Sequence, residues 1–286
     1  MLSDSEHKMS VVVLFGGMSS EHEVSRVSAG TFVDQLDRQR YELLTIGITK
    51  EGRWLYTEAD SARWPTQLGR AAGQYACVLS PDRADHGLIL FTPAGQVEKV
   101  HVDVVIPVLH GLWGEDGTVQ GLLELAGIPY VGCGVLASAV CMDKAVANAM
   151  FDASGIPHTK WLSATRWEIE SDPDGVCDGV IAKLGWPIFV KPANAGSSVG
   201  ITKAHDRDEL KAAIRLALAN DRKVVFEASW TATKWSAPSS APTPPSPPAR
   251  VRFWPVPNST PTTTSTRTAS VRWSFRPDCL RKSWMR

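Results

Sequence analysis

Short apolar runs that end in glycine-bearing polar loops constrain the fold of this chain most strongly. Residues 10–15 and 102–109 are apolar and β-branched, and they are followed by Gly16-Gly17 and by His110-Gly111. Runs of this length with these flanks predict buried strands. In a parallel sheet, ligands bind beyond the carboxyl ends of the strands. The two glycine-bearing loops therefore mark the expected binding edge.

Helical spacing alternates with these runs, which indicates an α/β fold with a parallel sheet. The expected helices are residues 23–36 and 118–126, and the further strands are residues 41–48 and a hairpin partner at residues 53–56. We expect this first α/β domain to span residues 1–132.

A second, α+β unit is expected over residues 133–228. A long helix is predicted from about residue 136 to residue 153. After it, the pattern predicts a strand at residues 186–191, a loop at 192–200, a strand at 201–203, a helix at 206–219 and a strand at 223–227.

The loop at residues 192–200 has the composition of a phosphate-binding loop. Its glycines and alanines let backbone N–H groups approach phosphate oxygens, its serines add donors, and Lys191 supplies a charge. It lies between two expected strands, whereas a P-loop or a dinucleotide-binding fingerprint needs a following helix. A plain hairpin turn is the alternative interpretation.

The other two polar loops are also open to simple interpretations. His110 can be a histidine that caps a strand. In the segment Gly16–Ser25, a carboxylate could hold an ammonium group, but Glu23 fits the ordinary enrichment of glutamate at a helix N-terminus.

Taken together, three segments resemble the D-alanine–D-alanine ligases of the ATP-grasp superfamily. They are FGGMSSEHEVS, LHGLWGEDGTVQGLLELAGIPYVGCGVLASAVCMDK and VKPANAGSSVGI, in this order. The resemblance covers residues 10–228. It implies a Rossmann-like N-terminal domain and a partial ATP-grasp domain.

The resemblance implies a D-alanine site. Glu21 matches the family glutamate that holds the ammonium group of the first D-alanine, and Ser197 matches the serine that hydrogen-bonds this glutamate. His110 matches the family histidine near the same substrate. Glu21 and Ser197 are the implied catalytic residues.

The resemblance also implies an ATP site. Lys144 and Lys191 match the two lysines on the phosphates, Gly196 and Ser198 belong to the phosphate loop, and Glu227 matches the acidic residue that receives the adenine amino group. In the family, ATP phosphorylates one D-alanine, and the amine of a second then attacks the acyl phosphate. Mg²⁺ or Mn²⁺ assists this step.

The composition changes abruptly at residue 229. Residues 229–286 carry nine Lys and Arg and a single acidic residue, Asp278, with 10 of the 19 prolines and 5 of the 11 tryptophans. The prolines forbid continuous helix or central strand, so we expect disorder there. A basic tail could bind nucleic acid. With one carboxylate, however, it cannot build the family's metal site.

Our hypothesis for the tail is a one-nucleotide frameshift in or next to codon 228, either real or a sequencing error. Back-translation of residues 229–237 with the frame moved by one base gives LDGHEVEC, and residues 249–260 then give PGEVLAGAEFY. The same one-base shift applied to residues 261–270 and 273–286 also gives readable segments. Together, the shifted segments resemble the part of the family sequence that follows residue 228. The printed chain is then expected to be an inactive remnant, whereas the corrected chain is an active ligase.

Other features narrow the class of protein. No run approaches the roughly 18 apolar residues of a membrane helix, and the five cysteines form no CxxC pair, which suits a reducing cytoplasm. We expect no nucleic-acid or membrane partner. The family is usually homodimeric. A ligase that makes D-alanyl-D-lactate or D-alanyl-D-serine is a narrower alternative, as is another ATP-grasp enzyme with a novel tail.

Overall fold

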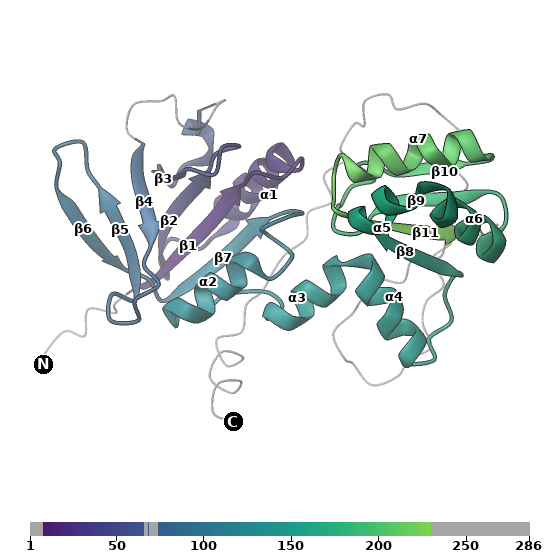
Figure 1. The fold of residues 1–286 in the computed structure, drawn as a ribbon. Helices are drawn as coiled ribbons and strands as arrows, with labels where there is room; N and C mark the ends of the chain where they lie inside the picture. The colour runs from purple at the N-terminus through teal and green to yellow at the C-terminus, as the bar shows by residue number, and fades with distance from the viewer. Residues whose placement is uncertain (1–7, 66–67, 69–73, 230–286) are drawn as a thin grey trace, which may run out of the picture. The chain divides into compact units, whose positions relative to one another are not determined.

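A computed structural model describes residues 8–65, 68 and 74–229 of this chain (Figure 1). The described residues group as one compact unit, which contains two β-sheets. The tail predicted to be disordered and frameshifted lies outside the described residues, except for Ser229.

The first sheet has seven strands in the order β6-β5-β4-β3-β2-β1-β7 (Figure 1). Their bounds are β1 Met9–Gly16, β2 Tyr41–Ile48, β3 Trp54–Thr57, β4 Tyr75–Leu79, β5 Gly87–Phe91, β6 Val97–His101 and β7 Val104–Leu109. β1 pairs in parallel with β2 and β7, and the remaining pairs are antiparallel. The predicted parallel α/β sheet is confirmed in β2-β1-β7, and the sequence analysis did not predict β4, β5 and β6.

The central strand β1 is buried on both faces, because a helix packs on each. Val11, Val13 and Phe15 pack with helix α1 (His22–Gln35), while Val12 and Leu14 pack with helix α2 (Thr118–Ala126). An unbroken apolar run is what a strand covered on both faces requires. This packing fixes the carboxyl end of β1, where the first polar loop begins.

The second sheet is antiparallel and has the order β10-β9-β11-β8. Its strands are β8 Trp161–Thr165, β9 Ile188–Pro192, β10 Thr202–Ala204 and β11 Lys223–Ala228, and its helices are α5 Arg166–Ser171, α6 Pro173–Leu184 and α7 Arg207–Leu218. α7 buries Leu210, Ala213 and Ile214 against this sheet. The sequence analysis predicted β9, β10, α7 and β11 to within about two residues, and it missed β8, α5 and α6.

The single long helix predicted for residues 136–153 is wrong. Two helices occur, α3 (Val135–Met142) and α4 (Lys144–Ala153), with a break at Asp143. The Asp143 carboxylate accepts hydrogen bonds from the backbone N–H groups of Ala145 at 3.0 Å and Val146 at 3.2 Å. An aspartate that caps a helix competes with continued helix at the same residue.

A short 3-10 helix at Ser61–Arg63 completes the described elements. Within residues 8–65, 68 and 74–229, no helix is long and apolar enough to span a bilayer.

Candidate functional site

The loop after β1, residues 16–21, is here called the strand-end loop, and its backbone is tied to the sheet. Gly16 and Gly17 have φ values of +87° and +94°, which glycine adopts without strain. The N–H of Gly17 donates to the carbonyl of Ile48 at 2.8 Å, and the N–H of Gly16 donates to Ser25 Oγ at 2.8 Å. The Ser25 hydroxyl in turn donates to the carbonyl of Val108. The loop is therefore held to the ends of β2 and β7.

Glu21 lies at the centre of the candidate substrate site. It is half-buried at the start of α1, and its carboxylate accepts a hydrogen bond from the Ser197 hydroxyl. A Cβ atom placed on Gly196 or Gly111 would come within 2.7 Å or 2.6 Å of Glu21 Oε2. A side chain at either position would therefore require the Glu21 carboxylate to shift. The predicted pair of Glu21 and Ser197 is brought together, and Gly196 has a packing role there as well.

His110 lies on the same loop as Gly111. Its Nε2 is 3.2 Å from Ser28 Oγ, and its Nδ1 is 4.0 Å from Glu115 Oε1. The backbone carbonyl of His110 accepts from the Ser19 hydroxyl at 2.7 Å. His110 is thus oriented by side chains at the predicted edge of the sheet, and the adjoining Gly111 approaches the Glu21 carboxylate.

Glu23 behaves as the simple interpretation predicted. It lies in the first turn of α1, is exposed, and forms ion pairs with Arg26 at 3.2 Å and Lys50 at 3.1 Å. The hydrogen bond from Lys50 lowers the pKa of Glu23 more than burial raises it, and the charges of Arg26 and Lys50 lower it further.

The loop between β9 and β10, residues 193–201, is here called the serine loop. Ser197 and Ser198 have φ values of +46° and +61°, in the left-handed region that non-glycine residues rarely adopt. Strained backbone of this kind concentrates at ligand-binding sites. Both serines are exposed to solvent, and the Ser197 hydroxyl contacts Glu21.

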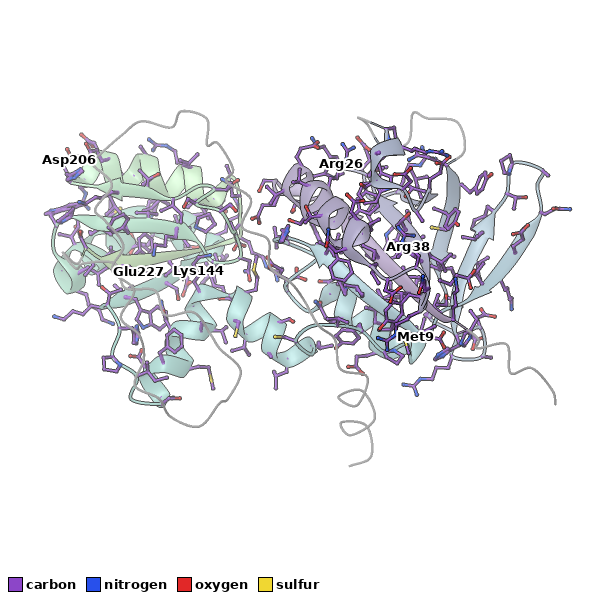
Figure 2. The ribbon with its side chains drawn as sticks, turned by 180° about the vertical axis from the view of Figure 1, so that it is seen from behind. Met9, Arg26, Arg38, Lys144, Asp206 and Glu227 are labelled. Carbon is purple, nitrogen blue, oxygen red and sulfur yellow. The ribbon has the colours of Figure 1, made fainter. Side chains whose placement is uncertain are left out.

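Lys144, the first residue of α4, lies near Glu227 (Figure 2), and its side chain contacts the serine loop. Its ammonium group donates to the carbonyls of Ala193 at 3.3 Å and Ala195 at 2.5 Å. Burial lowers the pKa of Lys144, and the charge of Lys191 lowers it further. The carboxylates of Glu227, Asp221 and Asp143 offset part of this effect, and a bound anion would offset it further.

Lys191 and Glu227 form an ion pair on neighbouring strands β9 and β11. Their side chains are only 22% and 15% exposed, so the pair is largely shielded from solvent. The sequence analysis assigned Lys191 to a phosphate and Glu227 to adenine, and it did not predict that they contact each other. The bond uses Glu227 Oε2, and Oε1 is the second acceptor of the same carboxylate.

A charged cluster that the sequence analysis missed adjoins Lys144. Lys223 pairs with Asp143 Oδ2 at 2.5 Å, and Asn194 Nδ2 lies 3.5 Å from the same oxygen. Asp221 Oδ2 accepts from the backbone N–H of Asn194 at 2.7 Å and from its side-chain amide at 3.1 Å. Asp143, next to Lys144, was the available signal, but its apolar surroundings favoured a continuous helix.

The predicted residues therefore fall into two groups that the serine loop connects. Glu21, Ser197 and Gly196 are in contact, with His110 beside them, and Lys144, Lys191 and Glu227 interact with one another. The first group suits an ammonium-bearing ligand and the second an anion. A metal centre is not supported within the described part of the chain, because no three His, Cys, Asp or Glu side chains gather there.

Comparison with family models gives two matches that together extend over this architecture. Residues 10–133 match the D-ala D-ala ligase N-terminus, and residues 150–236 match the D-ala D-ala ligase C-terminus. The chain belongs to the D-alanine–D-alanine ligase family. The two matched ranges contain the strand-end loop and the serine loop.

Individual ligases of this family agree with the assignment. The D-alanine–D-alanine ligase of Acetivibrio thermocellus is 47% identical over 231 residues, covering 77% of this chain and 61% of that relative. The one from Caldicellulosiruptor bescii is 48% identical over 224 residues, covering 77% and 60%. This chain thus spans about three fifths of the length of these ligases.

Solved structures of ligases share the fold. The VanG D-Ala:D-Ser ligase from Enterococcus faecalis is 36% identical with a TM-score of 0.69, covering 79% of this chain and 64% of that chain. The D-alanine-D-alanine ligase from Coxiella burnetii is 31% identical with a TM-score of 0.67, covering 78% and 64%.

Proposed function

We propose that this chain carries the D-alanine-binding and phosphate-binding parts of an ATP-dependent D-alanine–D-alanine ligase of peptidoglycan synthesis. One observation carries this proposal: Ser197 donates a hydrogen bond to Glu21, although 176 positions separate the two residues. The contact joins a loop suited to an ammonium group with a loop suited to phosphate. A ligase that phosphorylates an amino acid needs both beside each other.

In the substrate part, Glu21 holds the ammonium group of the first D-alanine. The Ser197 hydroxyl fixes the orientation of the Glu21 carboxylate, and His110 lies at the edge of the same site. A hydrogen bond between the D-alanine ammonium group and the Glu21 carboxylate contributes roughly 1.5–3 kcal/mol to binding when it is shielded from water.

In the phosphate part, Lys144 and Lys191 supply positive charge, and the serine loop with Gly196 and Ser198 supplies N–H and hydroxyl donors. The lowered pKa of Lys144 supports this assignment, because burial and the charge of Lys191 both disfavour its ammonium form and a bound phosphate would offset them. Glu227 accepts from the adenine amino group through the oxygen that Lys191 does not use.

The proposed reaction transfers the γ-phosphoryl group of ATP to the carboxylate of one D-alanine, giving ADP and an acyl phosphate. The amine of a second D-alanine then attacks the acyl carbon, and a carbon–nitrogen bond forms as inorganic phosphate leaves. Residues Glu21 and Lys144 act by binding and orienting, which is the main contribution of a protein to phosphoryl transfer.

The described residues do not fit Mg²⁺ or Mn²⁺, since they offer no cluster of carboxylates. We assign the metal ligands of the active ligase to the sequence beyond residue 228 in its corrected frame. We further propose a domain boundary near residue 133, a cytoplasmic location and a homodimer. Specificity for a second D-alanine, rather than D-lactate or D-serine, is part of the proposal.

A ligation assay tests the proposed function. The printed chain and a version with a one-nucleotide frame correction at codon 228 are each incubated with D-alanine, ATP and Mg²⁺, and ADP and D-alanyl-D-alanine are measured. The corrected chain should form both products, and the printed chain should form neither. Turnover by the printed chain would contradict the frameshift, and an inert corrected chain would contradict the ligase assignment.

A further inference from the structure

Asp143 occupies an unusual position, because its two carboxylate oxygens have separate tasks. Oδ1 accepts from the N–H groups of Ala145 at 3.0 Å and Val146 at 3.2 Å, which caps α4. Oδ2 accepts from Lys223 at 2.5 Å and lies 3.5 Å from the side-chain nitrogen of Asn194. One side chain thus contacts the start of α4, the start of β11 and the serine loop.

Backbone hydrogen bonds join the same three segments. The N–H of Lys144 donates to the carbonyl of Ala193 at 3.0 Å, and the N–H of Ala193 donates to the carbonyl of Lys223 at 3.0 Å. Asp221 holds Asn194 by two further bonds, at 2.7 Å and 3.1 Å. The start of the serine loop is therefore held by residues at the start of α4 and by residues at the start of β11.

These contacts determine the position of Lys144, the residue that follows Asp143. The Lys144 ammonium group is held by the carbonyls of Ala193 and Ala195, so its place depends on the register between α4 and the loop. Asp143 is 14% exposed and Lys223 is 26% exposed, so solvent weakens their ion pair less than that of a surface pair.

We infer that Asp143 is a positioning residue, which locks the N-terminus of α4 to the serine loop and thereby places Lys144 for contact with phosphate. The inference rests on the proposed phosphate-binding role of Lys144. Asp143 itself touches no substrate in this assignment, and it acts through Lys144.

Helix α7 provides a matched control for a simple cap. Asp206 accepts from the N–H groups of Asp208 at 3.0 Å and Glu209 at 2.9 Å, as Asp143 does at α4. Within the described part of the chain, no side chain of another segment bonds to Asp206. Asp206→Ala should lower Tm by about 2–4 °C, as loss of a cap does. The variant should leave phosphate binding unchanged.

The test compares the full 286-residue chain with its Asp143→Ala, Asp143→Asn and Asp206→Ala variants. Asp143→Asn keeps the oxygen that caps α4, but its amide group cannot form the ion pair with Lys223. This variant therefore separates loss of the ion pair from loss of the helix cap. Calorimetry measures the affinity for a non-hydrolysable ATP analogue and for adenosine. We expect about tenfold weaker binding of the analogue in both Asp143 variants, with adenosine unaffected. Unchanged affinity in Asp143→Asn, or an equal loss in Asp206→Ala, would overturn the inference.

A second measurement needs no nucleotide. The rate at which an amine-specific reagent modifies Lys144, followed by mass spectrometry, should rise at least about threefold in both Asp143 variants and stay unchanged in Asp206→Ala. If the unmodified chain fails to bind the ATP analogue, the proposed function is wrong, and the labelling still decides whether Asp143 positions Lys144. Equal labelling of Lys144 in all variants would refute that role.

Discussion

The strand-end loop and the serine loop both place residues in left-handed backbone, but they fill those positions differently. The strand-end loop uses Gly16 and Gly17, at φ +87° and +94°, and the serine loop uses Ser197 and Ser198, at φ +46° and +61°. A non-glycine residue in this region costs roughly 1–2 kcal/mol, whereas glycine does not. The comparison teaches that the first loop meets this backbone requirement with glycine, whereas the second accepts strained serines, of which Ser197 contacts Glu21 through its hydroxyl group.

The anchors of the two loops differ in the same way. Uncharged groups hold the strand-end loop, chiefly the carbonyl of Ile48 and the hydroxyl of Ser25. Charged groups hold the serine loop. Lys144 bonds to the carbonyl of Ala195, and Asp221 and Asp143 both bond to Asn194. The second loop should therefore respond to pH and to bound anions more strongly than the first.

The largest expected effect is on the backbone of the strand-end loop. In Gly16→Ala, the new Cβ would lie 2.3 Å from the Ile48 carbonyl oxygen at φ +87°, and we expect a loss of about 3 kcal/mol or more in unfolding free energy. Urea unfolding measures it. In Gly95→Ala, at φ +76°, the new Cβ would meet no described atom within 4 Å apart from its chain neighbours, so this variant isolates the strain and should cost about 1 kcal/mol. Similar losses in both variants would contradict the close-contact explanation.

The next effect concerns the contact between the loops. Glu21→Gln removes the charge that should hold an ammonium group, and D-alanine affinity should fall by roughly 2 kcal/mol, or about thirtyfold. An NMR titration of the full chain with D-alanine measures this affinity. Glu23→Gln is the control two residues away, because Glu23 is 63% exposed and pairs with surface cations. Equal affinity in Glu21→Gln and the unmodified chain would exclude Glu21 as the ammonium ligand.

A smaller effect distinguishes the charged anchors of the serine loop. Burial raises the pKa of Asp143, but the hydrogen bonds from Lys223 and the helix N–H groups outweigh it and keep the pKa below its ordinary value of 3.8. A carboxyl group with a lowered pKa stabilises the fold above that ordinary value, and the contribution is lost as pH falls through the folded-state pKa.

The unfolding free energy of the unmodified chain should therefore exceed that of Asp143→Asn by about 1 kcal/mol at pH near 6, and less at pH near 3. Urea unfolding at both pH values gives the comparison. A difference that grows on acidification would have the wrong sign for this assignment.

The smallest effect tests the strain in the serine loop. Ser198→Gly relieves backbone strain at φ +61°, and part of the gain is offset by the greater freedom of glycine in the unfolded chain. We expect a gain of about 0.5 kcal/mol in unfolding free energy, together with weaker binding of an ATP analogue. Thermal unfolding and calorimetry measure the two effects. Destabilisation by glycine would show that this backbone is not strained.

Periodicity and loop composition predicted the parts of the fold that have strong local signals. The run at residues 10–15 identified the central strand, and Asp206 with the apolar positions of α7 identified that helix. Strand β6 (Val97–His101) was missed because its burial pattern contains no buried position, so it has no alternation to detect. The break at Asp143 was missed because the apolar spacing continues across it, and only the capping contacts reveal the end of α3.

The candidate site was predicted through resemblance, and its charge pairs were not. The contact of Lys191 with Glu227 depends on the register between β9 and β11, which spacing along the chain does not fix. The hydrogen bonds between Asp221 and Asn194 likewise depend on where the fold places the serine loop relative to the start of β11. Long-range contacts of this kind come from the tertiary arrangement, and local patterns do not encode them individually.

A double-mutant cycle on Glu21 and Ser197 tests the central claim, that these two residues join the loops into one site. Urea unfolding of the full chain, Glu21→Ala, Ser197→Ala and the double variant gives the coupling energy without any ligand. We predict a coupling of about 1 kcal/mol or more, because each single change already removes the shared hydrogen bond. Additivity of the two single changes within about 0.3–0.5 kcal/mol would contradict the contact, and with it the proposed D-alanine site.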